Sequence, residues 1–321
     1  MEFGVYLPHA GPLCDPAAVR DVAQAAEELG FASVWVNDHI PHTLKWSEKF
    51  LCVGSLDAPN KPDHLEAVTS LSYVAASTSK VKLGFTVLVL PFRSPALLAK
   101  QCATLDVYSG GRLIFGVGAG GVEPEFRALD IPFKGRGNET VRSIRSIRKY
   151  WETGALDAQV EGEDLTFELL PRPVQQPAPP IWFGGHTPWA LRTTARHSEG
   201  WLPFALTLKE FQAKLQELDG VLAELERPRP TLATQHLIAI DEDGQRAEER
   251  ASKTLAARFG ELEKGLEKSL VGSPNQVLLK LRAYKGLGVE HVVLGFIATT
   301  VREMLDDMRL FATTILPTFQ S

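Results

Sequence analysis

The chain is short of the features that mark several large classes of protein. Its 321 residues contain three cysteines, Cys14, Cys52 and Cys102, which lie far apart and form no Cys-x-x-Cys pair. Such a set argues against a disulfide framework and for a reducing cytoplasm. No apolar run approaches the roughly 20 residues that a membrane-spanning helix needs. Acidic residues outnumber lysine and arginine, and the net charge of −5 indicates no surface of the kind that binds nucleic acid.

Sequence signatures of several kinds of site are missing as well. No Gly-x-Ser-x-Gly elbow is present, so a serine hydrolase is poorly supported. His39 and His42 have no clustered cysteine or carboxylate partner in the sequence, so we expect no metal. Met1 runs directly into the strand-like Phe3–Pro8, which leaves no room for a signal peptide. We therefore expect a cytoplasmic protein without membrane or nucleic-acid partners.

What the sequence does contain is a regular alternation of strand-like and helix-like segments, with no break in composition. The strands that we expect are Glu2–Leu7, Ser33–Asn37, Val81–Leu90, Leu113–Val117, Ile181–Phe183, Gly200–Pro203, Leu232–Ile240 and Val289–Phe296. Strict alternation of eight units predicts an α/β fold, a closed (β/α)8 TIM barrel with insertions that forms one domain over residues 1–321. The alternative is an open sheet made of two Rossmann-like halves.

Most of the long connections follow strands, namely residues 39–62, 119–137 and 241–275. In a barrel these connections surround the active-site face. Residues 40–62 are compatible with an apolar lid or with a packed loop. The Gln159–Pro179 segment precedes a strand instead, so we expect a small structural strand at the opposite face or flank. The charged residues of 241–275 predict a solvent-exposed helical excursion or a partner surface.

Two glycine-rich segments end predicted strands. Gly116–Gly121 formally matches Gly-x-Gly-x-x-Gly, but no helix opens on its last glycine, so a dinucleotide fingerprint is poorly supported. We interpret these glycines as room for a flat or phosphorylated ligand. Gly184-Gly185-His186-Thr187-Pro188 joins a strand to a helix, and free N–H groups there would make a phosphate seat. The alternative is an ordinary strand-to-helix turn.

Asp38 and His39 end the second predicted strand and form a candidate acid–base pair. Neighbours on an extended strand point to opposite faces, so we expect no direct bond between them. The alternative is a histidine that merely caps the barrel.

The chain resembles the bacterial luciferase-like superfamily of flavin and deazaflavin oxidoreductases. The resemblance covers nearly the whole chain, and its most specific pieces are Leu83–Pro95, Ala99–Gly111 and Arg112–Gly118. It implies a TIM barrel that binds a flavin-type cofactor. Asp-His after the second strand resembles the branch that uses coenzyme F420, an 8-hydroxy-5-deazaflavin. FMN enzymes of the bacterial luciferase type tend to carry Glu-His-His there.

The resemblance also implies roles for individual residues. His39 would lie near the reactive carbon of the deazaflavin, with Asp38 as its catalytic neighbour. The implied cofactor-binding residues are Thr86 and Val87 at a bulge, often a non-proline cis peptide, behind the ring; Ala119 and Gly120 beside the coenzyme; and Gly184, Gly185, His186 and Thr187 at its phosphate. Many deazaflavin members carry an aromatic residue where Gly121 stands, which indicates a wider pocket here. The 40–62 loop departs from the family's pattern, so the substrate stays open.

We therefore expect an oxidoreductase that transfers a hydride between F420 and a small organic substrate, with His39 as proton donor or acceptor. One alternative is a reduced-FMN-dependent monooxygenase of the bacterial luciferase type, which needs a partner reductase. Another is a family member that binds flavin-type ligands without turnover. Because members of this family often dimerise, we also expect a homodimer.

Overall fold

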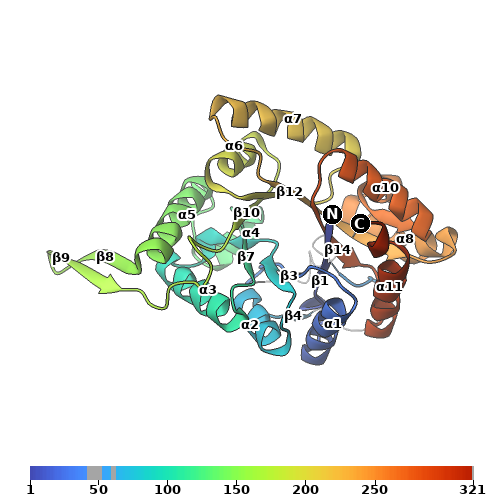
Figure 1. The fold of residues 1–321 in the computed structure, drawn as a ribbon, viewed down its shortest axis with the longest axis horizontal. Helices are drawn as coiled ribbons and strands as arrows, with labels where there is room; N and C mark the ends of the chain where they lie inside the picture. Colours follow the sequence, from blue (N-terminus) through green and yellow to red (C-terminus); the bar gives the residue numbers. More distant parts are fainter. Residues whose placement is uncertain (42–52, 59–62, 320–321) are drawn as a thin grey trace.

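The computed structural model describes residues 1–41, 53–58 and 63–319 and forms a closed parallel barrel with helices around it (Figure 1). The eight strands of the barrel, called staves below, are β1 (Glu2–Tyr6), β3 (Ser33–Val36), β5 (Lys82–Phe85), β7 (Leu113–Gly118), β10 (Ile181–Gly184), β11 (Gly200–Leu202), β12 (Thr231–Ile240) and β14 (His291–Phe296). Each stave pairs in parallel with the next, and β14 returns to β1. All eight predicted strands are present, and the predicted TIM barrel is confirmed.

Helices alternate with the strands and pack against the outside of the barrel. The eight outer helices are α1 (Pro16–Glu28), α2 (Ala67–Ser77), α3 (Pro95–Ser109), α5 (Arg136–Thr153), α6 (Pro188–His197), α7 (Leu208–Glu224), α10 (Pro274–Gly286) and α11 (Val301–Thr314). Local sequence sets several of their starts. Asp15 caps α1 by accepting from the N–H groups of Ala17 and Ala18, and Pro16 occupies its first turn.

The remaining elements are short, and most of them lie at the ends of the barrel. They are the antiparallel pair β2 (Ala10–Gly11) and β4 (Asp63–His64), the 3₁₀ turns η2 (Leu90–Phe92) and η3 (Leu316–Thr318), α4 (Glu123–Ala128), and the inserts described below. The third stave is interrupted, because β5 ends at Phe85 and the chain resumes pairing with β7 only at β6 (Leu88–Val89).

Two tryptophans fill the barrel interior, and glycines make room for them. The ring of Trp35 lies 5.4 Å from that of Trp182, and neither side chain is appreciably exposed. A Cβ atom on Gly4 or Gly84 would come within 2.3 Å of Trp35, and one on Gly200 within 2.5 Å of Trp182. Since interiors are close-packed, any larger residue at these three positions would displace an indole.

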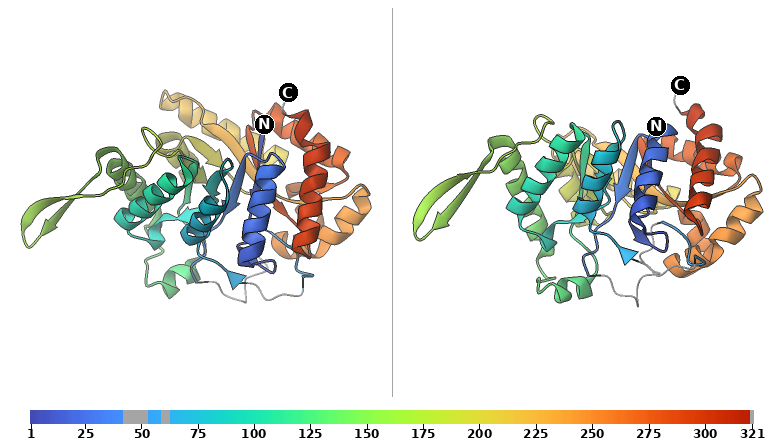
Figure 2. Two further views of the ribbon diagram at one scale, coloured as in Figure 1. Left: turned by 60° about the horizontal axis from the view of Figure 1, so that its bottom comes forward. Right: turned by 90° about the horizontal axis from the view of Figure 1, so that it is seen from below.

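The insert before β10 is a hairpin rather than the single strand that we expected. β8 (Ala155–Val160) pairs antiparallel with β9 (Glu163–Glu168), and every residue of β9 is exposed. Figure 2 shows this hairpin in green, projecting away from the barrel. It lies on the flank that the sequence indicated, because it follows α5 and precedes a strand.

The 241–275 segment is helical as predicted, but only partly a surface feature. It contains α8 (Gly244–Phe259), α9 (Leu262–Lys268) and β13 (Leu270–Gly272), an extra strand that pairs with β12. Ala247, Ala251 and Leu255 of α8 are buried in a small core of their own. Its spaced alanines therefore mark a packed face.

Across the described ranges, no helix is long and apolar enough to cross a membrane. Cys14 and Cys102 are free thiols, and Cys52 lies outside the described residues.

Candidate active site

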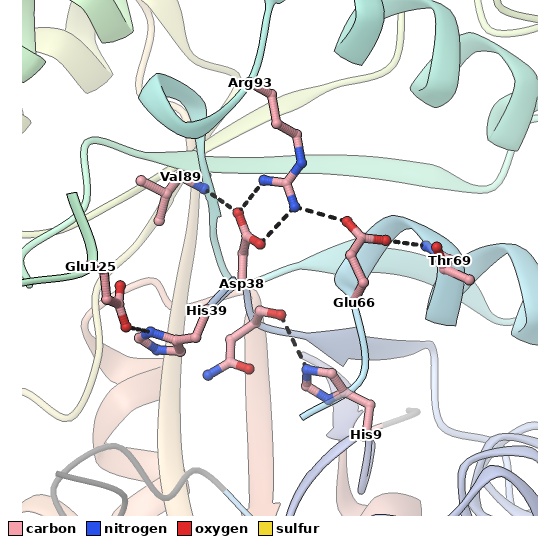
Figure 3. Close-up of polar contacts among 9 residues, drawn as sticks. His9, Asp38, His39, Glu66, Thr69, Val89, Arg93 and Glu125 are labelled. Atoms are coloured by element: carbon pink, nitrogen blue, oxygen red, sulfur yellow. Dashed lines mark hydrogen bonds and ion pairs between the residues drawn. The ribbon is translucent and has the colours of Figure 1, made fainter. Parts of the chain in front are cut away.

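Asp38 lies two residues beyond the end of β3 and is held by a buried ion pair. Its two carboxylate oxygens accept from Arg93, at 2.6 Å from Nη1 and 2.9 Å from Nη2 (Figure 3). The backbone N–H of Val89 donates to the same carboxylate at 3.0 Å. Asp38 is 3% exposed, so this two-pronged contact is shielded from water. It joins the end of β3 to β6 and to the start of α3.

Arg93 extends this pair into a network. Its Nη2 also donates to Glu66 at 2.8 Å, and Glu66 in turn caps α2 by accepting from the N–H of Thr69 at 2.7 Å. Burial opposes the charge on Arg93, but the hydrogen bonds to Asp38 and Glu66 outweigh it and raise the pKa of the guanidinium. Arg93 therefore stays charged and fixes the Asp38 carboxylate.

His39 points to a different partner, as the alternation of side chains predicts. Its Nδ1 lies 2.6 Å from Oε1 of Glu125, a residue of α4 that is itself 5% exposed (Figure 3). A proton on Nδ1 shared with this carboxylate fixes the orientation of the ring. Asp38 and His39 are thus held separately, by Arg93 and by Glu125.

Two further histidine rings stand beside His39. His64 of β4 lies 5.5 Å from His39 and 5.3 Å from His9, in edge-to-face contacts. His9 is fully buried after β1, and its Nε2 lies 3.1 Å from the carbonyl oxygen of Asn37. Burial lowers the pKa of His9, so its ring is neutral at pH 7. Within the described ranges, no three histidine, cysteine or acidic side chains are placed to hold a metal ion. His42 lies outside those ranges.

The bulge expected in the third strand is present at Thr86 and Val87. The peptide bond between them is cis, as the resemblance implied. The Thr86 hydroxyl donates to Oε1 of Gln235 at 2.8 Å, a buried contact that crosses the barrel interior from the third stave to β12. The Val87 side chain faces the ends of β7 and β10, since a Cβ on Gly118 or on Gly184 would come within 2.6 Å of it.

These contacts change the interpretation of the Gly116–Gly121 motif. A Cβ on Gly116 would lie 1.6 Å from the carbonyl oxygen of Phe85, so the bulge itself needs the space at this position. Gly120 has a φ of +74°, which favours glycine. A Cβ on Gly121 would meet nothing within 4 Å. Of these glycines, only Gly121 faces open space, and Gly116 and Gly118 serve internal packing.

Ala119 and Thr187 come together at a hollow of about 340 Å³. The hollow also contains Gly135 and Arg136 at the start of α5. No side chain caps that helix, because its N-cap is Gly135. Arg136 is anchored by donation from Nε to the carbonyl oxygen of Gly120 at 2.9 Å. Uncapped N–H groups and a fixed guanidinium favour an anion.

The Gly184–Thr187 turn contributes Thr187 to this hollow, whereas Gly184, Gly185 and His186 do not line it. Thr187 caps α6 by accepting from the N–H of Ala190 at 3.2 Å, and Gly185 has a φ of +104°. Its carbonyl oxygen accepts from Nε1 of Trp201 at 2.9 Å, which fixes the turn. His186 is exposed, and partial desolvation together with Lys214 lowers its pKa. The start of α6 thus lies beside the start of α5.

All ten residues expected at the site lie at or after the carboxyl ends of β3, β5, β7 and β10, where parallel barrels carry their active sites. Sequence reasoning missed Glu125, Arg93, Arg136 and Gln235. Glu125 carried a faint signal, because Val122-Glu-Pro-Glu places an acid in a loop at the same end of the barrel.

Comparisons with known proteins agree with this fold. The family model described as luciferase-like monooxygenase matches residues 1–268. An uncharacterised protein of Mycobacterium tuberculosis is 29% identical over 231 residues, which cover 68% of this chain and 76% of the relative. The FMNH2-dependent dimethylsulfone monooxygenase of Pseudomonas putida is 25% identical over 290 residues, 78% of each chain. The coenzyme F420-dependent tetrahydromethanopterin reductase of Methanopyrus kandleri superposes with a TM-score of 0.79 at 21% identity, covering 99% of each chain.

Proposed function

Because this chain belongs to the luciferase-like monooxygenase family, we propose that it is an oxidoreductase that exchanges a hydride between coenzyme F420 and a small organic substrate. The observation that carries the proposal is His39 at the end of β3, held through Nδ1 by Glu125 and followed along the barrel rim by the Thr86–Val87 bulge. The Asp38-His39 sequence favours F420 over FMN.

The residues present fit a flat, phosphorylated cofactor. The Thr86–Val87 bulge would support the ring, and Ala119 and Gly120 would flank it. The hollow at Ala119 and Thr187 would take the phosphate, because Arg136 and two helix starts supply positive potential there. When bound, the deazaflavin supplies or accepts the hydride, which no side chain of the protein can do.

His39 is the proposed catalytic residue, and its task is to move a proton at Nε2. In the reducing direction it gives that proton to the substrate atom that gains charge as the hydride arrives at carbon. In the oxidising direction it takes the proton back. Glu125 accepts from Nδ1 in either direction and stabilises the imidazolium.

Asp38 is a proposed positioning residue. Both of its oxygens are engaged, by Arg93 and by the N–H of Val89, so the carboxylate fixes the strand end from which His39 projects. A neutral side chain at position 38 would leave the buried guanidinium of Arg93 with Glu66 as its remaining carboxylate.

The second candidate is a reduced-FMN monooxygenase that depends on a partner reductase. It is favoured by the Pseudomonas putida relative, whose name states FMNH2 dependence and whose match covers 78% of both chains. The hollow at Ala119 and Thr187 suits the phosphate of either cofactor. The choice between F420 and FMN therefore depends on the ring of the cofactor and on the Asp38-His39 pair.

Equilibrium titration of the purified protein with F420 and with FMN, each oxidised and reduced, tests the choice of cofactor. We expect saturable binding of F420 and weaker binding of FMN. Tight FMN binding with no measurable affinity for F420 would reverse the assignment and support the monooxygenase.

Replacing His39 tests the assigned chemistry. We expect His39→Ala to slow single-turnover hydride transfer by about 10²–10⁴-fold, the usual contribution of a general acid or base. Coenzyme affinity should change little, because the proposed ring and phosphate contacts lie elsewhere. A variant that folds, binds F420 and reacts at the parent rate would remove His39 from the mechanism.

A further inference from the structure

A groove of about 510 Å³ runs between α5 and α6 on the outside of the barrel. The two helices lie side by side at the left of Figure 1. Four arginines line the groove, Arg142 and Arg145 from α5 and Arg192 and Arg196 from α6, and its lining contains no carboxylate. In a chain with a net charge of −5, this concentration of positive charge is local.

Most of this charge is not neutralised by neighbouring side chains. Arg142 pairs with Glu139 on its own helix, and Arg148, near the end of the groove, pairs with Glu199. Arg145, Arg192 and Arg196 make no ion pair with any described residue, and all three are exposed.

The positive charge of these arginines acts on His197, which also lines the groove. Burial lowers the pKa of His197, and Arg145, Arg148, Arg196 and Arg227 lower it further. The groove therefore favours anions over cations.

The groove continues directly from the hollow at Ala119 and Thr187, which is the proposed phosphate site. Asn138 and Trp189 line both the groove and the hollow at Ala119 and Thr187. Trp189 packs on Phe183 at 5.7 Å and leaves 37% of its surface exposed, so it forms a fixed wall between the two. A ligand whose phosphate occupied the hollow would extend into the groove past this indole.

We propose that the groove binds a chain of carboxylates attached to the cofactor's phosphate. This inference rests on the proposed function, because F420 carries an oligoglutamate tail beyond its phosphate, whereas FMN ends there. Arginines three or four residues apart on a helix are spaced by about 5–6 Å and present a row of donors to successive carboxylates. The row of arginines therefore matches the row of carboxylates that such a tail would bring into the groove.

The experiment compares three ligands by equilibrium binding, using the intrinsic fluorescence of the deazaflavin. They are long-tailed F420, short-tailed F420, and the riboflavin-like deazaflavin that lacks both phosphate and tail. We expect the parent to bind the long-tailed form most tightly, with an advantage that falls as salt is raised. A triple variant with Arg145→Gln, Arg192→Gln and Arg196→Gln should lose about tenfold in affinity for that form, from three exposed ion pairs.

The control is Arg282→Gln with Arg302→Gln, two exposed arginines of α10 and α11 on the far side of the barrel. It lowers the net charge without touching the groove and should leave the preference for the long tail unchanged. Equal affinity of the parent for long and short tails would overturn this inference while leaving F420 dependence intact. Failure of all three ligands to bind would instead overturn the proposed function and the inference with it.

A single-stranded RNA oligonucleotide is tested as a competitor in the same binding experiment. We expect it to compete weakly with long-tailed F420. RNA that binds more tightly than long-tailed F420, and loses that affinity in the triple variant, would assign the groove to polyphosphate and overturn the inference.

Discussion

The carboxylate of Glu125 fixes the imidazole of His39, and its removal should slow chemistry without weakening binding. Glu125→Gln keeps the size of the side chain but removes the charge that stabilises a protonated ring. We expect kcat to fall by about 10–100-fold, the usual cost of losing a partner that orients a functional histidine, with KM and coenzyme affinity nearly unchanged. Steady-state kinetics and coenzyme titration measure both.

Glu123→Gln is the matched control, because Glu123 lies on the same helix but pairs with Arg127 at the surface. It should keep the parent kcat. A loss in KM alone for Glu125→Gln, or equal losses in the two variants, would contradict the positioning role of Glu125.

His236 makes stability sensitive to mild acid. It is buried in β12 and bonded to the carbonyl oxygen of Lys268, and burial lowers its pKa from 6.5 to about 4. The unfolded chain therefore takes up the proton first, so stability is lost as the pH falls from 6.5 towards 4. Between pH 7 and pH 5 this amounts to about 2 kcal/mol from His236.

Urea unfolding across that range measures the effect. His236→Gln should flatten the slope of unfolding free energy against pH, whatever its effect on stability at pH 7. The slope should not vanish, because burial lowers the pKa of His9 and His291 as well. An unchanged slope in the variant would show that His236 does not titrate in this way.

The candidate site residues differ in whether the sequence alone could predict them. Asp38 and His39 were predicted as site residues because they follow a strand, and strand ends converge in a barrel. Their partners were not, because Glu125 reaches His39 from 86 positions away and Arg93 reaches Asp38 from 55 positions away. Periodicity carries no information about such approaches, which depend on how loops pack.

Arg112 clamps the starts of two strands at the face opposite the site. Its guanidinium donates five hydrogen bonds, to the carbonyl oxygens of Ser109, Val81, Ala75 and Thr78 and to the Thr78 hydroxyl. Arg112→Met should lower the free energy of unfolding by about 2–4 kcal/mol, because these half-buried acceptors lose their donors. Denaturant titration checks this.

The kinetics of folded Arg112→Met should match the parent, since the strand starts lie away from the site. Arg112→Lys, which keeps the charge but has fewer donors, should fall between the two in stability. A Met variant as stable as the parent would show that the clamp is not needed.

Elements with a buried face were predicted better than elements without one, although the wholly exposed β9 corresponds to the small strand that the sequence predicted. The eight staves are almost wholly buried, so their apolar runs stand out. β8 has no buried residue, and its sequence carries no apolar period that could mark it as a strand. The buried face of α8 was hidden for a related reason, since alanines among charges resemble a solvated helix.

The homodimer expected from the sequence stays a prediction, and we expect its contact to involve α2 and α3. Tyr73, Leu97, Val107 and Tyr108 on these helices are exposed by 40% or more. We expect these side chains to take part in the subunit contact. Leu97→Glu should shift the protein towards monomer in sedimentation or light scattering.

Leu279→Glu is the control, because Leu279 is 65% exposed on α10, across the barrel from α3. It should leave the assembly unchanged. A parent protein that stays monomeric at high concentration would contradict the expected dimer.

The arginine groove also makes the charge distribution of the molecule asymmetric. Across the barrel from it, the surface at the start of α8 gathers Glu242, Asp243, Glu248 and Glu249 around one depression. These two clusters contribute a dipole directed from α8 towards α5 and α6. An incoming polyanion is turned by this field before contact and arrives preferentially on the α5–α6 side, so its association rate should fall steeply with ionic strength while its departure rate changes little.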